Sequence, residues 1–207
     1  MATVDAEKKL QNRVLHWLVD DLGYTYLGNL EDIDNTPVKE ELLKANLKKR
    51  GYTDDQIKTA ISELVGKVNN QSDTLYQINR SVYSLLRYGR QGAKDAHGHR
   101  QTVHYIDWDD IGKNDFFVAE EVSVLRFDKV TRKRPDVVLY INGIALGVFE
   151  LKSSHVSAGK GIRQLLQNQK KENIMSFFST SQLLFAGNEA QGLFYGTTET
   201  KEKYFYQ

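Results

Sequence analysis

The sequence predicts an α/β fold with an additional helical lobe, and three observations lead to this expectation. Apolar residues recur at helical spacing in residues 5–22 and again between residues 36 and 89. From residue 102 onward the pattern changes to short strand-like runs bounded by turn residues. Helical spacing then returns in residues 160–176, ahead of two more strand-like runs. A chain of 207 residues is long enough for one core and such a lobe.

The first helix is expected to cover residues 5–22. It should end at Gly23, because glycine readily adopts the left-handed conformation that stops a helix. The apolar side chains at helical spacing, which should form its buried face, are Leu10, Val14, Trp17 and Leu18.

Three further helices are expected in the lobe. The first should begin with Thr36 as its cap and Pro37 in its first position, and Gly51 should end it. The residues from Thr53 to Gln56 have the pattern of a capping box, which predicts a second helix to about residue 68. A third should end at Gly89, and its apolar positions are Leu75, Ile78, Val82, Leu85 and Leu86.

The rest of the chain predicts strands around one more helix. Residues 90–101 are rich in glycine and charge, and we expect an exposed, mobile loop there. Strand patterns then follow in "TVHYIDW", "DFFVAEEVSVLRF" and the two arms of a hairpin at 134–152. After the helix at 160–176, the closing strands are expected in "SQLLFAG" and "GLFYGTT".

Composition is typical of a soluble cytoplasmic protein. Hydrophobic residues make up 40% of the chain and charged residues 27%. Since no apolar run approaches the roughly 20 residues that cross a bilayer, we expect no membrane contact. The chain has no cysteine, which suits a reducing compartment and excludes cysteine-based zinc sites. The net charge of +1 does not suggest that the whole surface binds a polyanion.

The hairpin "RPDVVLYINGIALGVFELK" carries three charged residues at its open end, namely Asp136, Glu150 and Lys152. A regular two-residue turn at Asn142-Gly143 would put Asp136 opposite Phe149 and on the other face from Glu150. A three-residue loop, or a bulge near Gly147, would instead bring the two carboxylates together. Because isolated buried charges are costly, we expect one of these two devices.

Converging there, the three groups fit a site for a hard cation and a phosphate. Mg²⁺ prefers oxygen ligands, and Asp136, Glu150 and the backbone carbonyl of Leu151 would supply them. The two acids should keep Lys152 charged, so we expect it to orient water and to stabilise developing negative charge. The motif is short, and an ordinary surface ion pair remains the alternative. Basic residues bracket the hairpin, and those we expect to contact DNA are Lys133, Arg134, Lys160 and Arg163.

The hairpin closely resembles the nuclease motif of the restriction (R) subunit of type I restriction-modification enzymes. The resemblance extends along the chain through "LQNRVLHWLVDDLGYTYLGN", "SVYSLLRYG", "HYIDWDD", "FVAEEVSV", "GIRQLLQNQ" and "FFSTSQLLFAGNEAQGLFYGTTETKEKYF". It implies a single PD-(D/E)xK endonuclease domain over residues 1–207, with a mixed sheet flanked by helices. The lobe would cover about 30–90, and the nuclease core about 1–25 and 102–200.

The resemblance also implies Mg²⁺-dependent cleavage of double-stranded DNA. Its site residues carry over as Asp136, Glu150, Lys152 and, on the following helix, Gln164. The tyrosine that often stands four residues after that glutamine is replaced here by Asn168. Glu7 is the nearest candidate for an acidic ligand on the first helix, and a solvated glutamate at a helix start is the alternative.

In the family an ATP-driven motor follows this domain, and methyltransferase and specificity subunits are the partners. This chain contains no phosphate-binding Gly-x-x-x-x-Gly-Lys-Ser/Thr loop, so we expect an N-terminal fragment of a longer chain in which ATP serves the motor alone. Two rival functions remain open. One is an inert module that docks the motor and methyltransferase subunits, and the other is a repair nuclease that prefers branched DNA.

Overall fold

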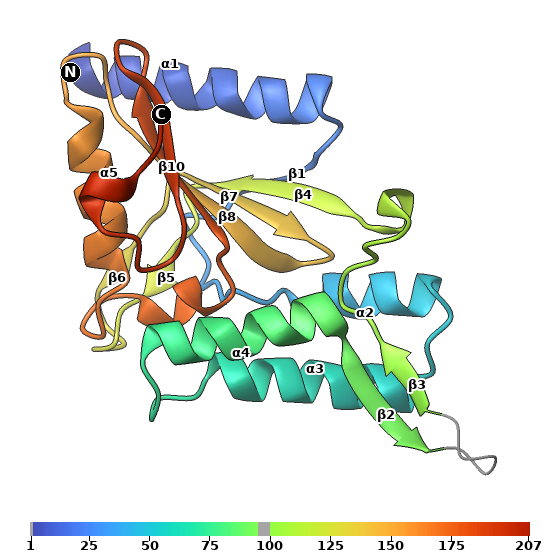
Figure 1. Cartoon of the computed structure of the whole chain (residues 1–207). Coiled ribbons are helices and arrows are strands. Elements are labelled where there is room, and N and C mark those ends of the chain that lie inside the picture. Colours follow the sequence, from blue (N-terminus) through green and yellow to red (C-terminus); the bar gives the residue numbers. More distant parts are fainter. Residues whose placement is uncertain (1, 95–99) are drawn as a thin grey trace.

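The computed structural model describes residues 2–94 and 100–207 and has the expected α/β architecture (Figure 1). Its centre is a six-stranded mixed sheet in the order β1-β4-β7-β8-β9-β10. The strands are β1 Thr25–Asn29, β4 Phe116–Glu120, β7 Val137–Ile141, β8 Ile144–Leu151, β9 Leu183–Asn188 and β10 Gly192–Gly196. β1 runs parallel to β4 and β8 runs parallel to β9, while the other pairs are antiparallel.

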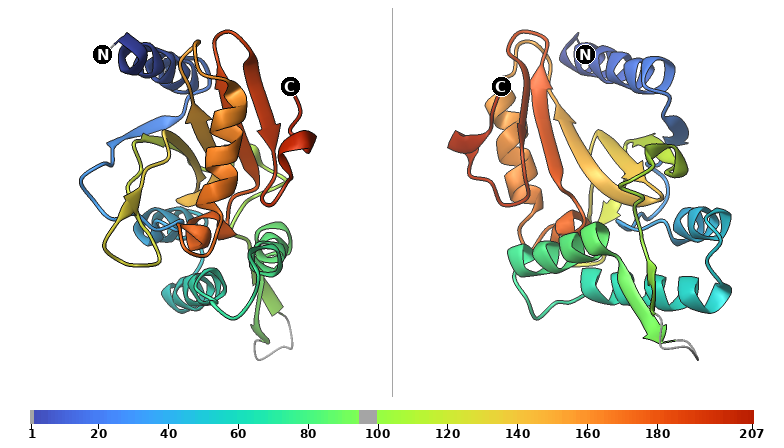
Figure 2. Two further views of the ribbon diagram at one scale, coloured as in Figure 1. Left: turned by 90° about the vertical axis from the view of Figure 1, so that its left-hand side faces the viewer. Right: turned by 45° about the vertical axis from the view of Figure 1, so that its right-hand side comes forward.

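Helices cover both faces of this sheet and form the lobe beneath it (Figures 1 and 2). α1 (Ala2–His16) lies on one face and α5 (Ala158–Asn168) on the other, as expected for a mixed sheet flanked by helices. The lobe is inserted between β1 and β4 and consists of α2 (Glu40–Lys49), α3 (Asp54–Val68) and α4 (Leu75–Tyr88). Short 3₁₀ turns occur at Ile111–Lys113, Met175–Ser179 and Glu202–Tyr204.

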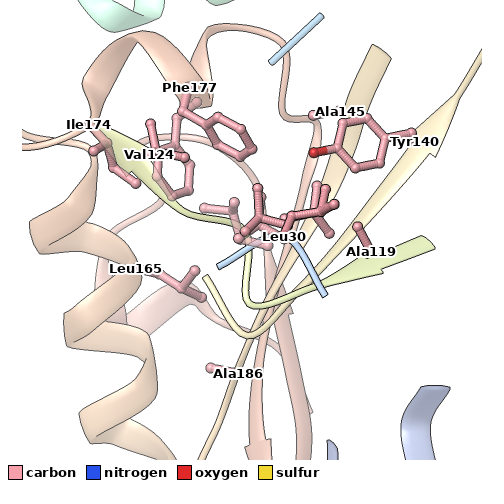
Figure 3. Packing of buried hydrophobic residues seen from close by; sticks show 14 of the residues in the cluster. Leu30, Ala119, Val124, Tyr140, Ala145, Leu165, Ile174, Phe177 and Ala186 are labelled. Carbon is pink, nitrogen blue, oxygen red and sulfur yellow. The ribbon is translucent and has the colours of Figure 1, made fainter. Parts of the chain in front are cut away.

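Three apolar clusters hold these layers together. The first fills the space between the sheet, α5 and the turn at Met175–Ser179, and Figure 3 shows its packing around Tyr140, Leu165 and Phe177. A second lies inside the lobe and reaches the hairpin through Ile144. The third joins α1 to the opposite sheet face through Leu10, Leu18, Val118, Val137, Phe149 and Leu151. Alternate residues of β7 and β8 therefore serve opposite faces, which makes their register decisive for the site.

Several local predictions are confirmed. Gly23, Gly51 and Gly89 have φ values of 74°, 87° and 74°, and each follows a helix. At the start of α3, Gln56 N–H donates to Thr53 Oγ1 and Thr53 N–H donates to Gln56 Oε1, which completes the expected capping box. Local sequence could decide these features because each depends on residues within one helical turn.

Two details of the predicted helices are wrong. Trp17 is 50% exposed, because after His16 the chain widens into a π-helical turn at Trp17–Asp21 that rotates the apolar stripe. Thr36 caps no helix, since α2 begins at Glu40. Instead the segment before α2 pairs with the hairpin: Lys39 N–H donates to the carbonyl of Gly143, and Ala145 N–H donates to that of Pro37.

The strand region also departs from expectation in detail. Part of the expected loop at 90–101 forms the hairpin β2 (Arg90–Lys94) and β3 (Arg100–Val103), while residues 95–99 lie outside the described residues. The run at 102–108 is a strand only to Val103, and β1 was not predicted.

Two predicted elements are shorter than expected. The run at 115–127 divides into β4 and β5 (Val124–Leu125), because Glu121 has a positive φ of 51°. β5 then pairs with β6 (Arg132–Lys133) in a separate two-stranded ribbon. The helix expected at 160–176 ends at Asn168. Among the helices of the described residues, none has both the length and the apolar character that a membrane span requires.

Candidate active site

A single bulge sets the geometry of the hairpin. The turn at Asn142-Gly143 is a two-residue turn with φ values of 53° and 84°, and it pairs Ile141 with Ile144. Tyr140 pairs with Ala145 but Leu139 pairs with Gly147, so Leu146 is an extra residue in β8. Beyond the bulge Val137 pairs with Phe149, and continuing this register brings Asp136 opposite Glu150. The expectation of a loop or a bulge is therefore confirmed: the device is the bulge, one residue before Gly147, and the turn keeps two residues.

The three charged groups of the motif meet where β7 begins and β8 ends. Leu151 N–H donates to Asp136 Oδ2 at 2.6 Å, which fixes the aspartate beside the end of β8. Lys152 Nζ donates to Glu150 Oε1 at 2.6 Å. Glu7, on α1, brings its Oε1 to 3.6 Å from the same ammonium. Both sheet strands and α1 therefore converge on Lys152, whose side chain is 13% exposed.

Burial dominates the electrostatics of the two acids. It raises the pKa of Glu150, whose side chain is 1% exposed, and the facing Asp136 raises that pKa further. Burial likewise raises the pKa of Asp136, although Lys152 and the Leu151 N–H oppose the shift. For Lys152, burial lowers the pKa, but Glu150 and then Asp136 and Glu7 outweigh it, so the net shift is upward and the ammonium stays charged.

One carboxylate oxygen in this cluster lacks a partner. Glu150 Oε2 is buried, and no donor among the described residues reaches it. A buried charged acceptor of this kind is unfavourable unless a cation or donor satisfies it. No three Asp, Glu or His side chains in the described part of the chain form a ready-made metal cluster. Two carboxylates with a free oxygen do fit Mg²⁺, which commonly uses one or two carboxylates and fills its remaining positions with water and substrate phosphate.

The cluster opens into a cavity of about 570 Å³. Its walls are Glu7, Glu31, Glu121, Ser123, Arg132, Arg134, Asp136, Glu150, Lys152 and Gln164. Gln164, predicted from the following helix, thus lies on the same cavity. A larger groove of about 810 Å³ lies in the lobe and contains Glu40, Lys44 and Ile57 but no buried pair of carboxylates. The charged groups of the motif therefore open into the smaller cavity.

The expected DNA-contacting residues divide into two groups. Arg134 lines the cavity, and its Nε lies 2.7 Å from Glu121 Oε2, while a second ion pair joins it to Glu31. Lys133 lies beside it on β6. Lys160 is exposed on α5, and Arg163 forms an ion pair with Glu202 at 2.6 Å. Neither of these α5 cations lines the cavity.

Sequence reasoning missed a buried polar cluster that attaches α1 to the site. Glu120, at the end of β4, accepts hydrogen bonds from Lys8 Nζ at 2.6 Å, Gln11 Nε2 at 2.8 Å and Tyr26 OH at 2.6 Å. Gln11 also donates to the backbone carbonyl of Asp136 at 3.2 Å. These contacts hold the first turns of α1, and with them Glu7, over the open end of the hairpin. The partners are separated by 94 to 125 residues, so no local motif could have revealed them.

Comparison with known proteins places this chain in a family. The family model described as the N terminus of the type I restriction enzyme R protein matches residues 6–203. The chain belongs to this family. The resemblance seen in the sequence is thereby confirmed, and the match includes every residue of the R-protein cavity described above.

Curated relatives of this R-protein domain carry matching names. The putative type I restriction enzyme MjaIXP endonuclease subunit of Methanocaldococcus jannaschii is 23% identical over 199 residues, covering 89% of this chain and 19% of that protein. The type I restriction enzyme SauMSSORF170P endonuclease subunit of Staphylococcus aureus is 23% identical over 95% of this chain and 20% of its own length. The HindI endonuclease subunit of Haemophilus influenzae is 31% identical over 77 residues, which are 36% of this chain and 7% of that subunit. The chain thus spans about a fifth of the length of the two relatives that match most of it.

Proposed function

We propose that this domain hydrolyses phosphodiester bonds of double-stranded DNA in the cavity at the open end of the hairpin, with Mg²⁺ as its cofactor. The observation that carries the proposal is the buried pair Asp136 and Glu150, with one unsatisfied oxygen, beside a charged lysine. Names of the relatives support a nuclease role, because they are endonuclease subunits. An ordinary surface ion pair does not account for the site, since Glu150 is buried.

Each residue has a distinct task in this reaction. Asp136 and Glu150 would hold the cofactor, together with the backbone carbonyl of Leu151, and Glu7 would add negative charge from α1. Mg²⁺, when bound, polarises a phosphoryl oxygen and makes water a stronger nucleophile at neutral pH. Leu151 N–H keeps Asp136 in a fixed position, so little rearrangement is needed when the phosphate enters.

Lys152 would stabilise the reacting phosphate electrostatically. Its pKa is raised by the surrounding acids, so it is charged at neutral pH and is a poor general base. Its ammonium already contacts Glu150, from which it can orient the attacking water and balance the negative charge that develops on the phosphate. Gln164, on α5, also lines the cavity and offers an amide donor to substrate or water.

The larger protein would supply what this chain lacks. The domain spans about a fifth of its relatives, and we propose that a motor driven by ATP follows it in the full-length subunit. Methyltransferase and specificity subunits would then choose the DNA site, and the assembly would act in the cytoplasm, away from membranes.

Plasmid nicking tests the proposal. We expect the chain to convert supercoiled plasmid to nicked or linear forms with Mg²⁺ and not with EDTA. Lys152→Ala and Glu150→Gln should reduce the rate to background, whereas Lys44→Ala, on the exposed face of α2, should leave it unchanged. Cutting by Lys152→Ala at the wild-type rate would refute the assigned site. Preferential cutting of four-way junctions over linear duplex would indicate a branched-DNA nuclease, and no cutting by any form would favour a docking module.

A further inference from the structure

The two-stranded ribbon beside the cavity is rich in cationic side chains. We call residues 124–134, which comprise β5, β6, the loop between them and Arg134, the basic ribbon. It contains one acidic residue and five cationic ones, namely Arg126, Lys129, Arg132, Lys133 and Arg134. Its tip exposes two apolar side chains, Phe127 at 59% and Val130 at 79%. Exposed apolar side chains at the tip and clustered positive charges along the edges are both typical of an interaction surface. The partner that fits is anionic and has apolar surface between its charges.

Hydrogen bonds fix the turn at the tip. The Asp128 carboxylate accepts hydrogen bonds from Val130 N–H and Thr131 N–H, both at 2.9 Å, and from the Thr131 hydroxyl at 2.5 Å. These bonds lower the pKa of Asp128 to about 2. The single acid of the ribbon therefore makes its hydrogen bonds within the turn. Phe127 N–H also donates to the carbonyl of Asn173, which anchors the base of the tip. Phe127 and Val130 are thus presented in a preorganised arrangement.

The cations of the ribbon are available to an anionic partner. Among the described residues no acid pairs with Lys129 or Lys133. Arg132 pairs with Asp34 and Arg134 pairs with Glu31, and all four of these side chains are about half exposed, while Glu121 also holds Arg134 at the cavity wall. Exposed ion pairs of this kind are weak in water, so a phosphate group can take the place of either carboxylate.

The ribbon is connected directly to the catalytic cavity. β6 leads through Arg134 and Pro135 into Asp136, and both Arg132 and Arg134 line the cavity wall. Val122 N–H donates to the carbonyl of Pro135, and Glu121 N–H donates to that of Asp136, which fixes the junction. Figure 2 shows the ribbon extending to one side of α5, next to the segment that follows β1. Asp136 stands six positions after Val130, so the tip lies within roughly 20 Å of the aspartate.

We propose that the basic ribbon enters the major groove of double-stranded DNA and holds the duplex across the cavity. A two-stranded β-ribbon fits this groove, where its cations reach the phosphates on either side and its apolar tip meets base edges and methyl groups. The reach of roughly 20 Å places the tip within about six base pairs of the phosphate that is cleaved. The inference rests on the proposed function, and it names the contact that positions the substrate.

Binding measured without hydrolysis tests the ribbon separately from catalysis. A fluorescent 30-base-pair duplex is titrated with the full chain in EDTA, and anisotropy is recorded at several salt concentrations. Lys129→Ala/Lys133→Ala should weaken binding about tenfold or more and lower the salt slope by about two, because two phosphate contacts are lost. Phe127→Ala/Val130→Ala should weaken binding about fivefold without changing that slope. All four side chains lie outside the core clusters, and matching thermal unfolding curves verify that each variant folds.

Matched controls carry the same substitutions elsewhere. Lys44→Ala/Lys58→Ala removes two lysines of the lobe, and Ile111→Ala removes an apolar side chain that is 73% exposed. Both should bind like the wild type. Three results would each overturn the ribbon inference. The ribbon variants could bind DNA like these controls, the wild-type chain could fail to bind duplex, or a minor-groove ligand such as netropsin could compete with the wild type. Plasmid nicking with Mg²⁺ is measured separately. If the wild type nicks DNA and the ribbon variants bind DNA as well as the wild type, the ribbon inference alone is refuted. If the wild type binds duplex but does not nick it, the proposed hydrolysis is refuted.

Discussion

Replacing Lys152 by methionine should destabilise the metal-free domain at high pH and leave it almost unchanged at low pH. The side chain is mostly buried and its ammonium lies 2.6 Å from Glu150. At an effective dielectric constant of about 20, that contact is worth roughly 6 kcal/mol before desolvation, and desolvation of the two charges offsets about half of it. When both acids are ionised, the loss of Lys152 should therefore lower the free energy of unfolding by about 3 kcal/mol.

The pH window follows from the two carboxyl groups. Burial raises the pKa of Asp136 to about 6 and that of Glu150 to about 8, so the folded state binds more protons than the unfolded state between about pH 4 and pH 8. In the wild type this pair favours folding least above pH 8 and most below pH 4. At pH 5 both acids are largely protonated, Lys152 has little charge to neutralise, and its replacement should change stability by less than about 0.5 kcal/mol.

Urea unfolding followed by far-ultraviolet circular dichroism, in EDTA at pH 5 and pH 8.5, measures both effects. In a domain of this size the loss of about 3 kcal/mol corresponds to a fall in Tm of roughly 6–12 °C. The control is Glu150→Gln/Lys152→Met, in which the Glu150 charge is absent, so the pH dependence that Glu150 contributes should disappear while that of Asp136 remains. Equal destabilisation of Lys152→Met at both pH values would show that packing, and not charge neutralisation, is the role of this lysine.

Three further predictions concern the metal and the hairpin. At pH 8, 10 mM Mg²⁺ should raise the Tm of the wild type by a few degrees, as RT ln(1 + [L]/Kd) requires for a Kd of about 1 mM. Asp136→Asn should abolish this rise, and an equal rise in both proteins would place the metal elsewhere. Deleting Leu146 removes the bulge and turns the carboxylates to opposite faces, so plasmid nicking should fall to background. Leu146→Ala keeps the register and should retain nicking activity. Activity in the deletion variant would refute the role of the bulge. Gly143→Ala should lower the free energy of unfolding, measured by chemical denaturation, by about 2–3 kcal/mol, because φ is 84° and a Cβ would lie 2.7 Å from the Lys39 carbonyl. Gly66→Ala, in open space on α3, should raise it by up to about 1 kcal/mol. Similar values for the two variants would contradict this reasoning.

Much of the hairpin could be predicted from sequence because its physics is local. Asn142-Gly143 specifies a two-residue turn, and the apolar run of β8 specifies burial. Those two facts conflict with a shared site for Asp136 and Glu150, and the conflict itself predicted either a three-residue loop or a bulge. Which residue would form it could not be predicted, since Leu146 is selected by packing against the lobe.

The distant members of the site could not be predicted in the same way. Glu31 follows β1, a strand that the sequence did not indicate, and it reaches the cavity only because β1 pairs with β4. Glu120 lies at the end of β4, and its partners on α1 and β1 are far away in the chain. Arg134 was expected to contact DNA, and in the structure Glu31 and Glu121 hold it at the cavity wall.

The sequence by itself determined the charged triad, the helix stops, the capping box at Thr53 and the α/β class, because each depends on residues close together in the chain or on periodicity along it. Tertiary structure alone decided which groups share the cavity. Pairing of β1 with β4 brings Glu31 to the cavity wall, and the docking of α1 through Glu120 brings Glu7 to Lys152. The physical reason is that a buried charge selects its partners by distance in space, and only the packed sheet with its helices fixes that distance.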